Sequence, residues 1–338
     1  MNTSKTRKLP SPPSLITALR VGFDAITNNI ILILFPIALD SLLWLGPHLR
    51  LTQLINSVIQ QLSSLYSLQD PGAKELLQSN QTLWAQLAEH FNLLSALRSY
   101  PVGIPSLMAY LSPAKTPAGI PGGWEIHSLG GVILTWILIT LVGLMTGTIY
   151  FAAVSNAALS GQVNWRSTLT QWPWASLQVL LLSLLLAVLL IGVSIPGSFV
   201  ISLSVLGGLT IGQCAIILYG LFLIWLIIPL LFSSHGIFVN RQNVFFSLKT
   251  SIFLTRRTIF PTLLFFLAVL LLSKGLDSLW MVPPETSWFM LIGIAGHAFV
   301  TTGLLAASFV YYRDAIQWLQ TIAQELKTAS QHNPIRGE

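Results

Sequence analysis

Long apolar runs without charged side chains constrain this fold more than any other feature of the sequence. Leu209–Phe232 contains no Asp, Glu, Lys or Arg, and the same holds for Ile259–Leu272. A helix of about 20 apolar residues is needed to cross a hydrocarbon core of about 30 Å. Because only a short polar segment separates the two runs, they predict a transmembrane hairpin whose second helix continues to Trp280.

The linking segment, 234–258, is basic and amphipathic. It contains Arg241, Lys249, Arg256 and Arg257 and no acidic residue. Lys and Arg collect in short loops on the cytoplasmic side of a membrane, so we place this segment in the cytoplasm. We expect its apolar residues to rest in the headgroup layer while the four cations contact anionic lipid. A solvated basic loop is the alternative, but it would leave aromatic side chains in water.

The composition agrees with a membrane protein. The chain is 53% hydrophobic and 8% charged, whereas an ordinary soluble domain is about 25% charged. The net charge of +6 is expected to meet anionic headgroups and calls for no nucleic acid. The single cysteine, Cys214, excludes an internal disulfide and a cysteine-based metal site.

Runs of similar length elsewhere predict an all-α polytopic transmembrane bundle of about six spans. We predict spans at 26–45, 129–154, 174–195, 209–232, 259–280 and 288–312, with a short inner loop at 156–173 and a final amphipathic helix at 315–327. Pro196 and Gly197 are expected to end the third span, after which 199–208 is either a helix extension or a re-entrant segment. The chain then divides into a cytoplasmic tail with an interfacial helix (1–25), a first transmembrane helix (26–46), an extracytoplasmic cap (47–128), a five-span membrane domain (129–312) and a cytoplasmic C-terminal helix and tail (313–338).

The long loop 47–128 is predicted to form a helical cap on the outer face. Leu51–Tyr66 carries apolar residues at the i, i+3, i+4 and i+7 spacing of an amphipathic helix, and 76–94 has a similar apolar set. Five prolines between Pro101 and Pro121 exclude a long helix from the remainder. Most of the 17 Lys and Arg residues fall in segments that this topology puts inside. We therefore expect a bacterial inner-membrane protein with both termini in the cytoplasm.

Ionisable groups inside spans are few, and each is a candidate functional residue. Asp40, Lys274, His297 and Gln213 all fall in the outer half of their spans, where they could line a polar chamber open to the outside. In the alternative interpretation, Lys274 pairs with Asp277 on its own helix and both reach the interface. Asp40 would then bond locally near the outer headgroups, and replacing it with asparagine would hardly change stability.

Glycines form a second set of candidates because they let transmembrane helices approach closely. The candidates are Gly143 and Gly147, Gly208 and Gly212, and Gly293, Gly296 and Gly303. Packing within the chain is favoured over dimerisation.

Motifs of known catalytic chemistry are missing from the sequence. It has no HExxH, no Gly-Lys-Ser/Thr phosphate loop, no Gly-x-Ser-x-Gly and no paired cysteines. We therefore expect no enzymatic activity, no cofactor and no metal ion.

From Phe232 to Pro261 the chain follows a recognisable order: an apolar span, then Ile or Val, then a helix with Leu-Lys-x-Ser, then Arg and the next span. The residues that carry it are Ile237, Val239, Leu248, Lys249, Ser251 and Arg256. In this the chain resembles bacterial multi-pass proteins similar to the membrane domain attached to glycerophosphodiester phosphodiesterases. The resemblance covers the last four spans and implies a membrane fold. The long outer loop departs from it, no hydrolase domain accompanies it, and it implies no activity.

Two functions are compared on the basis of the sequence, and an intramembrane enzyme is a third alternative. The first is a scaffold or accessory protein whose cap and glycine-lined faces contact lipid or other membrane proteins. The second is a transporter or permease-like protein that uses the polar layer in the outer half of the membrane. A transporter should turn Asp40 and Lys274 toward a shared cavity, whereas a scaffold should pair them with headgroups or with neighbouring residues.

Overall fold

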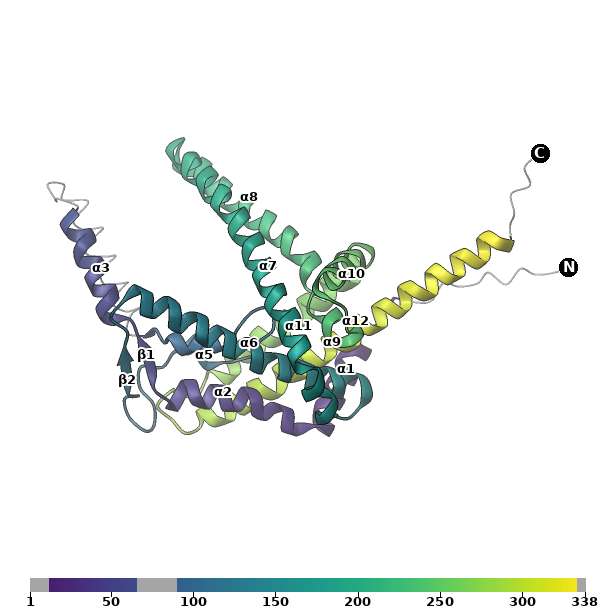
Figure 1. Cartoon of the computed structure of the whole chain (residues 1–338), viewed down its shortest axis with the longest axis horizontal. Coiled ribbons are helices and arrows are strands. Elements are labelled where there is room, and N and C mark those ends of the chain that lie inside the picture. The colour runs from purple at the N-terminus through teal and green to yellow at the C-terminus, as the bar shows by residue number, and fades with distance from the viewer. Residues whose placement is uncertain (1–11, 66–89, 333–338) are drawn as a thin grey trace. The chain divides into compact units, whose positions relative to one another are not determined.

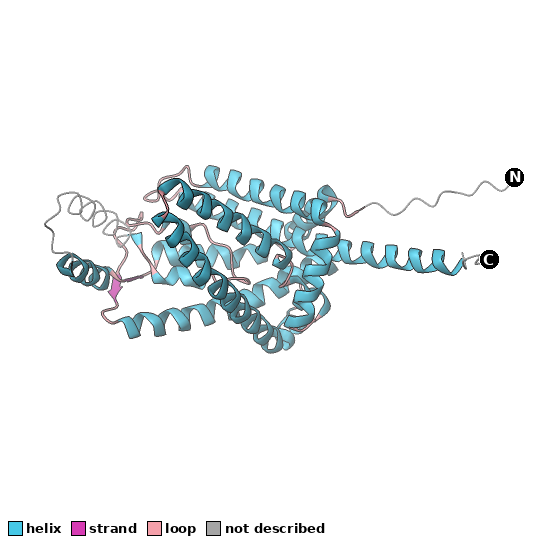
Figure 2. Cartoon of the chain, turned by 90° about the horizontal axis from the view of Figure 1, so that it is seen from above, coloured by secondary structure: helices cyan, strands magenta, loops and turns pink. Residues whose placement is uncertain are grey.

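The fold is almost entirely helical, as predicted. The computed structural model describes residues 12–65 and 90–332, and it is 78% helical. In the described part of the chain two short strands, β1 (His48–Arg50) and β2 (Gly123–Glu125), pair in parallel. This pairing was not predicted from the sequence. Figures 1 and 2 show the helices in two views.

Five of the described helices are long and apolar enough to cross a membrane, and a sixth is added if the bent pair Leu15–Asn28 and Ile30–Leu45 counts as one span. The five are α6 (Leu129–Ser160), α7 (Trp165–Leu206), α8 (Leu209–Ile227), α11 (Ile259–Trp280) and α12 (Met290–His332); the span that begins with α8 continues through η3 (Ile228–Leu230) and α9 (His235–Asn240). The bent pair consists of α1 (Leu15–Asn28), η1 (Ile30–Ile33) and α2 (Leu34–Leu45). This confirms an all-α helical bundle, and the predicted number of about six spans is reached if the bent pair counts as one. The first predicted span, 26–45, is not straight, because the chain bends by 92° between α1 and the helix that follows it.

Helix α7 corrects the prediction that the third span ends at Pro196. The helix runs for 42 residues and contains both Pro173 and Pro196. It begins at Trp165, where the Asn164 side chain caps it by accepting from Ser167 N at 3.0 Å, so most of the predicted inner loop is helical. Of the two alternatives for 199–208, the structure has the helix extension as far as Leu206. Proline is tolerated inside membrane helices because nearby hydroxyl groups and helices satisfy the freed backbone groups.

Helix α12 is also longer than predicted. It runs unbroken for 43 residues, so the separate final helix predicted at 315–327 is part of it. The chain between α9 and α11 forms α10 (Val244–Arg257), which Asn243 caps by accepting from Phe246 N at 3.0 Å. This agrees with the helix expected in the basic segment. Helix α3 (Thr52–Leu65) likewise agrees with the first helix of the predicted cap, while most of the second, 76–94, lies outside the described residues.

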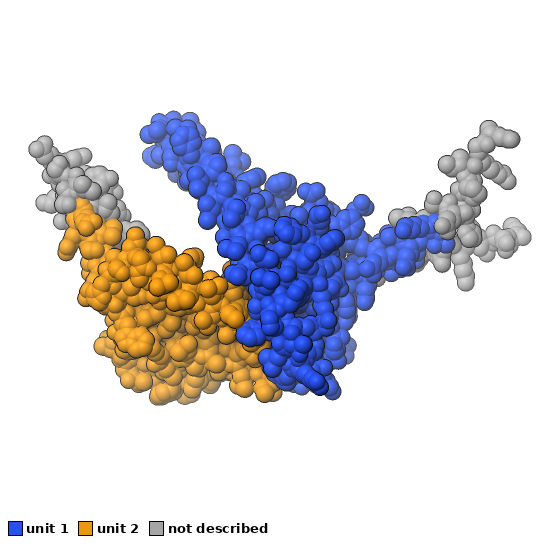
Figure 3. Space-filling view, viewed as in Figure 1, with its two compact units in different colours: residues 1–29, 152–271, 303–338 blue, residues 30–151, 272–302 orange. Residues whose placement is uncertain are grey.

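The chain forms two compact units that interleave along the sequence (Figure 3). The described residues of unit 1 are 12–29, 152–271 and 303–332, and those of unit 2 are 30–65, 90–151 and 272–302. Helices α6, α11 and α12 each contribute to both units. The division therefore follows packing within each unit and not the order of the chain.

Unit 1 has an aromatic core. Phe232, Phe265 and Tyr311 are 0 to 1% exposed, and the rings of Phe265 and Tyr311 stack at 4.3 Å between centroids. Helix α1 packs on α12 so closely that a Cβ at Gly22 would collide with the backbone of Ala307. Only glycine fits at this crossing, in line with the role of small residues between membrane helices.

Unit 2 contains an irregular segment that packs against α2 and α6. Residues 92–111 include only η2 (Leu93–Leu97) and the four-residue helix α5 (Met108–Leu111). Leu97 and Gly103 from this segment lie against Gly143 and Gly147, near the middle of α6. Leu93, Val102, Leu107 and Met108 of this segment are buried, so the segment is packed against the helices of unit 2.

Candidate functional site

Asp40 on α2 holds the irregular segment in place. Its side chain is fully buried, and its carboxylate accepts hydrogen bonds from Ser106 Oγ at 2.5 Å, Leu107 N at 3.2 Å and Met108 N at 3.0 Å. Non-helical backbone inside a membrane bundle needs internal partners, because an unpaired amide in an apolar medium is strongly unfavourable. The carboxylate supplies them at the start of α5.

This placement differs from the alternative in which Asp40 bonds locally near headgroups. Its partners lie 66 to 68 residues further along the chain. Ser106 was not singled out from the sequence, although Pro105-Ser106 ahead of an apolar run is a helix-start signal. Its hydroxyl also accepts from Ala109 N at 3.0 Å and thus caps α5.

A second polar group links α11 to α12. Asp277 Oδ1 lies 2.8 Å from His297 Nδ1, and Asp277 Oδ2 lies 3.1 Å from Lys274 Nζ. The side chains of Asp277 and His297 are 9% and 4% exposed, while that of Lys274 is 52% exposed. His297 Nε2 is buried and has no hydrogen-bond partner among the described residues. Lys274 therefore pairs with the residue three positions along its own helix, and that pair continues inward to a buried imidazole.

Lys274 also lies against an aromatic ring outside the spans. Its Nζ is 4.3 Å from the centroid of Tyr110, and Arg98 Cζ is 4.2 Å from the same centroid. Partial burial by itself raises the pKa of Tyr110, but hydrogen bonds and charge from Arg98 and Lys274 outweigh it and leave that pKa below its usual value. The outward end of the polar group is thus cationic and aromatic, as is common at a membrane interface.

Three of the four residues of the predicted polar layer belong to one unit. Asp40, Lys274 and His297 are all in unit 2. Gln213 lies on α8 in unit 1 and is exposed. Within unit 2, Asp277 is also part of this polar group, because it is bonded to His297. From the sequence, Asp277 was considered only as a partner of Lys274.

The candidate glycines are in close contact with the chain itself in six of seven cases. Gly143 and Gly147 face the irregular segment, Gly293 and Gly296 face Trp280, Gly212 faces Val205 and Gly303 faces the ring of Phe23. The seventh, Gly208, has φ = 133° and lies at the turn between α7 and α8 with no described atom within 4 Å of an added Cβ. Gly208 therefore serves the turn through its backbone conformation, which other residues rarely adopt.

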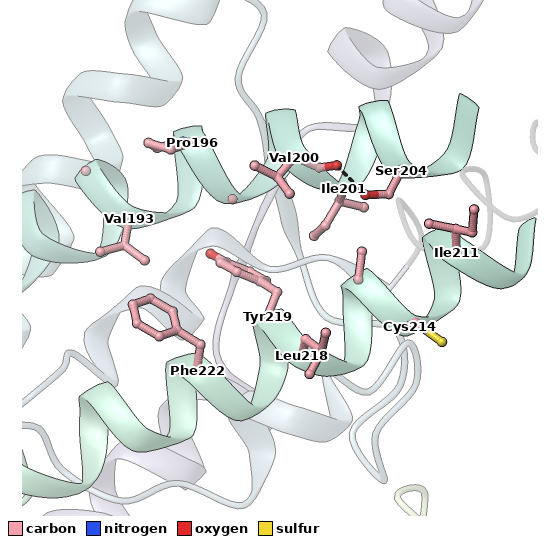
Figure 4. A pocket seen from close by; sticks show the side chains of 13 residues that line it. Val193, Pro196, Val200, Ile201, Ser204, Ile211, Cys214, Leu218, Tyr219 and Phe222 are labelled. Carbon is pink, nitrogen blue, oxygen red and sulfur yellow. Dashed lines mark hydrogen bonds between the residues drawn. The ribbon is translucent and has the colours of Figure 1, made fainter. Parts of the chain in front are cut away.

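An apolar cavity of about 740 Å³ lies between α7 and α8 (Figure 4). Val193, Val200 and Leu218 are among its lining residues, and Tyr219 donates a hydrogen bond to Ser194 Oγ at 2.9 Å beside it. A Cβ at Gly197 would collide with the Tyr219 ring. The cavity has no charged lining residue, so it is suited to hydrocarbon rather than to a polar substrate.

The described residues contain no group of three or more His, Cys, Asp or Glu side chains that could hold a metal ion. Comparison with known proteins adds no further assignment. No family model, no curated protein and no solved structure matches this chain.

Proposed function

We propose that this integral membrane protein has a scaffolding or accessory role and no enzymatic activity. The observation that carries the proposal is the environment of Asp40. Its carboxylate is fully buried and accepts three hydrogen bonds from the protein's own 106–108 segment. A side chain engaged in this way stabilises the bundle and has little capacity left for a ligand.

A surface available to a partner is the α7–α8 hairpin. Between Arg166 and Arg241 the sequence has no Asp, Glu, Lys or Arg, and large apolar residues such as Ile217 are exposed there. Most candidate glycines pack within the chain and are not free for a partner. An apolar partner helix or lipid fits such a surface. The excess of Lys and Arg in the inner segments supports a bacterial inner-membrane location with both termini in the cytoplasm.

A photo-crosslinking residue at Ile217, which is 63% exposed, tests this role in native membranes. The matched control is Leu182 on α7, which is fully buried. The proposal expects one reproducible protein adduct from Ile217 and none from Leu182. Adducts with lipid alone at Ile217 would contradict it.

Proton-coupled transport is the second candidate, and His297 favours it. Its buried Nε2 has no described partner while Nδ1 is bonded to Asp277. Chains of Asp and His inside membranes act as proton relays.

Proteoliposomes with an imposed pH gradient separate the two candidates. A scaffold predicts equal proton flux for the wild type and His297→Gln. A flux present in the wild type, lost in His297→Gln and kept in the exposed control Gln213→Ala would replace the scaffold by a transporter.

A further inference from the structure

A groove in unit 1 combines apolar walls with one cation. It has a volume of about 350 Å³ and lies between α7, α8, η3, α10 and the start of α11. Trp225, Pro229, Ile252 and Ile259 contribute to its apolar walls, and Arg256 is its charged lining residue. The groove is therefore amphipathic: its walls are apolar and one side chain is charged, as in a lipid molecule with apolar chains and a charged headgroup.

Thr255 gives the groove an unsatisfied polar group. The residue is 1% exposed and lines the groove beside Arg256. Its Oγ1 is buried and has no hydrogen-bond partner in the part of the chain that the structure describes. An unpaired buried hydroxyl is unfavourable, so an oxygen atom of a ligand in the groove would relieve it.

The groove has one cationic and no acidic lining residue. No acidic residue occurs between Glu125 and Asp277 in the sequence, and the ion pairs among the described residues do not include Lys249, Arg256 or Arg257. Ile259, at the edge of the groove, is the first residue of α11, and helix N-termini carry partial positive charge. The site therefore attracts an anion.

The outer face of α10 indicates that this anion lies in a membrane interface. Ser247, Ser251 and Leu254 are buried against unit 1, whereas Phe245, Phe246 and Phe253 are 64%, 63% and 55% exposed. Lys249 and Arg257 lie over the rings of Phe246 and Phe253, at 6.0 and 5.4 Å from their centroids. A helix that exposes aromatic rings beside cations is typical of the headgroup layer.

We propose that this groove binds one anionic phospholipid, with an acyl chain along Trp225, Pro229 and Ile252 and the phosphate at Arg256. The Thr255 hydroxyl donates to a lipid oxygen atom. Free phosphate would use the cation but would leave the apolar walls uncovered, so the lipid is the better occupant. The inference does not depend on the scaffolding role.

The test measures lipid binding to the full-length protein in detergent, by native mass spectrometry and by the lipid-induced rise in melting temperature. The probes are phosphatidylglycerol, phosphatidylcholine with the same chains, and inorganic phosphate. Arg256→Gln should weaken phosphatidylglycerol binding roughly tenfold, the scale of a charge-assisted hydrogen bond. The control Arg257→Gln, which makes the same charge change on the next residue outside the groove, should weaken it by less than about twofold.

Two further variants test the groove itself. Ile252→Trp fills the groove and should reduce phosphatidylglycerol binding with Arg256 intact. Thr255→Val should raise the melting temperature of the delipidated protein, because it removes the unpaired hydroxyl, and should reduce the additional rise produced by lipid.

Three outcomes would overturn the proposal. Equal losses in Arg256→Gln and Arg257→Gln would indicate diffuse attraction to the basic helix. Unchanged binding in Ile252→Trp would show that no acyl chain occupies the groove. A melting-temperature rise from inorganic phosphate equal to that from phosphatidylglycerol would assign the site to a free anion.

Discussion

Replacing Asp40 with asparagine tests whether its carboxylate stabilises unit 2. Oδ1 accepts from Ser106 Oγ and Met108 N, and Oδ2 accepts from Leu107 N. An asparagine amide can keep the two bonds at Oδ1 but turns an N–H group toward the N–H of Leu107. That donor is then orphaned in a fully buried site.

The expected loss follows from these three bonds. An orphaned buried donor costs about 1–3 kcal/mol, and the two remaining bonds lose the assistance of the charge. The removal of a buried charge offsets part of this loss. We expect Asp40→Asn to lower the free energy of unfolding by about 3 kcal/mol and Ser106→Ala by about 1–2 kcal/mol.

The assay is reversible unfolding of the purified protein in mixed detergent micelles, followed by circular dichroism. Asp24→Asn is the control, because the Asp24 side chain is 67% exposed and pairs only loosely with Arg20; its expected effect is below about 0.5 kcal/mol. The double variant of Asp40 and Ser106 should fall short of the sum of the single losses, since the two side chains are in contact. An Asp40→Asn protein as stable as the Asp24→Asn control would refute the structural role.

Three other perturbations have calculable outcomes. Phe265→Ala should lower the free energy of unfolding of unit 1 by about 3–5 kcal/mol, because the ring is fully buried against Tyr311. The control Phe260→Ala removes a ring on the same helix that is 83% exposed and should change the free energy of unfolding little. Equal melting temperatures for the two variants would contradict this prediction. Gly22→Ala should lower the free energy of unfolding by about 1–3 kcal/mol, because the added Cβ overlaps with the Ala307 backbone. The control is Gly192→Ala, whose Cβ meets no described atom within 4 Å; it should be neutral or slightly stabilising in the same unfolding assay. Burial, with a smaller effect of the Arg50 charge, lowers the pKa of His48, so the unfolded chain binds a proton at this imidazole more readily than the folded protein does. The free energy of unfolding should therefore be highest above about pH 6.5, the ordinary pKa of histidine, and should fall as the pH drops below that value. His48→Gln should remove that part of the pH dependence in melting temperatures measured from pH 7.5 to 5, and an unchanged slope would exclude His48 as its source.

The local pattern of the sequence was sufficient for two of the helices. Ile259–Trp280 was predicted with the bounds that α11 has, and Leu51–Tyr66 agrees closely with α3. Both results rest on the same physical basis: the apolar length of a helix and the spacing of its apolar face are encoded in consecutive residues.

The long helix α7 shows where local rules fail. Pro196 ends a helix in most soluble contexts, but here the helix continues to Leu206. The reason lies in the surroundings, since leaving the helix inside hydrocarbon would expose many backbone groups, and a proline frees only one carbonyl group and removes one donor. The choice between the two alternatives for 199–208 could not be made from the proline alone.

The candidate site depended on contacts between distant parts of the chain. The sequence identified Asp40, Lys274 and His297 as rare ionisable groups within spans, and it offered a pair of Lys274 with Asp277, one helix turn away, as one of two alternatives. It could not supply Ser106 as the partner of Asp40 or place the 92–111 segment against α6, because those contacts join residues tens of positions apart. Charge content and apolar length thus determined that the chain enters a membrane. The tertiary structure decided which groups its buried charges bind, because a polar group in an apolar interior needs a partner, and only the fold determines which segment lies close enough to supply one.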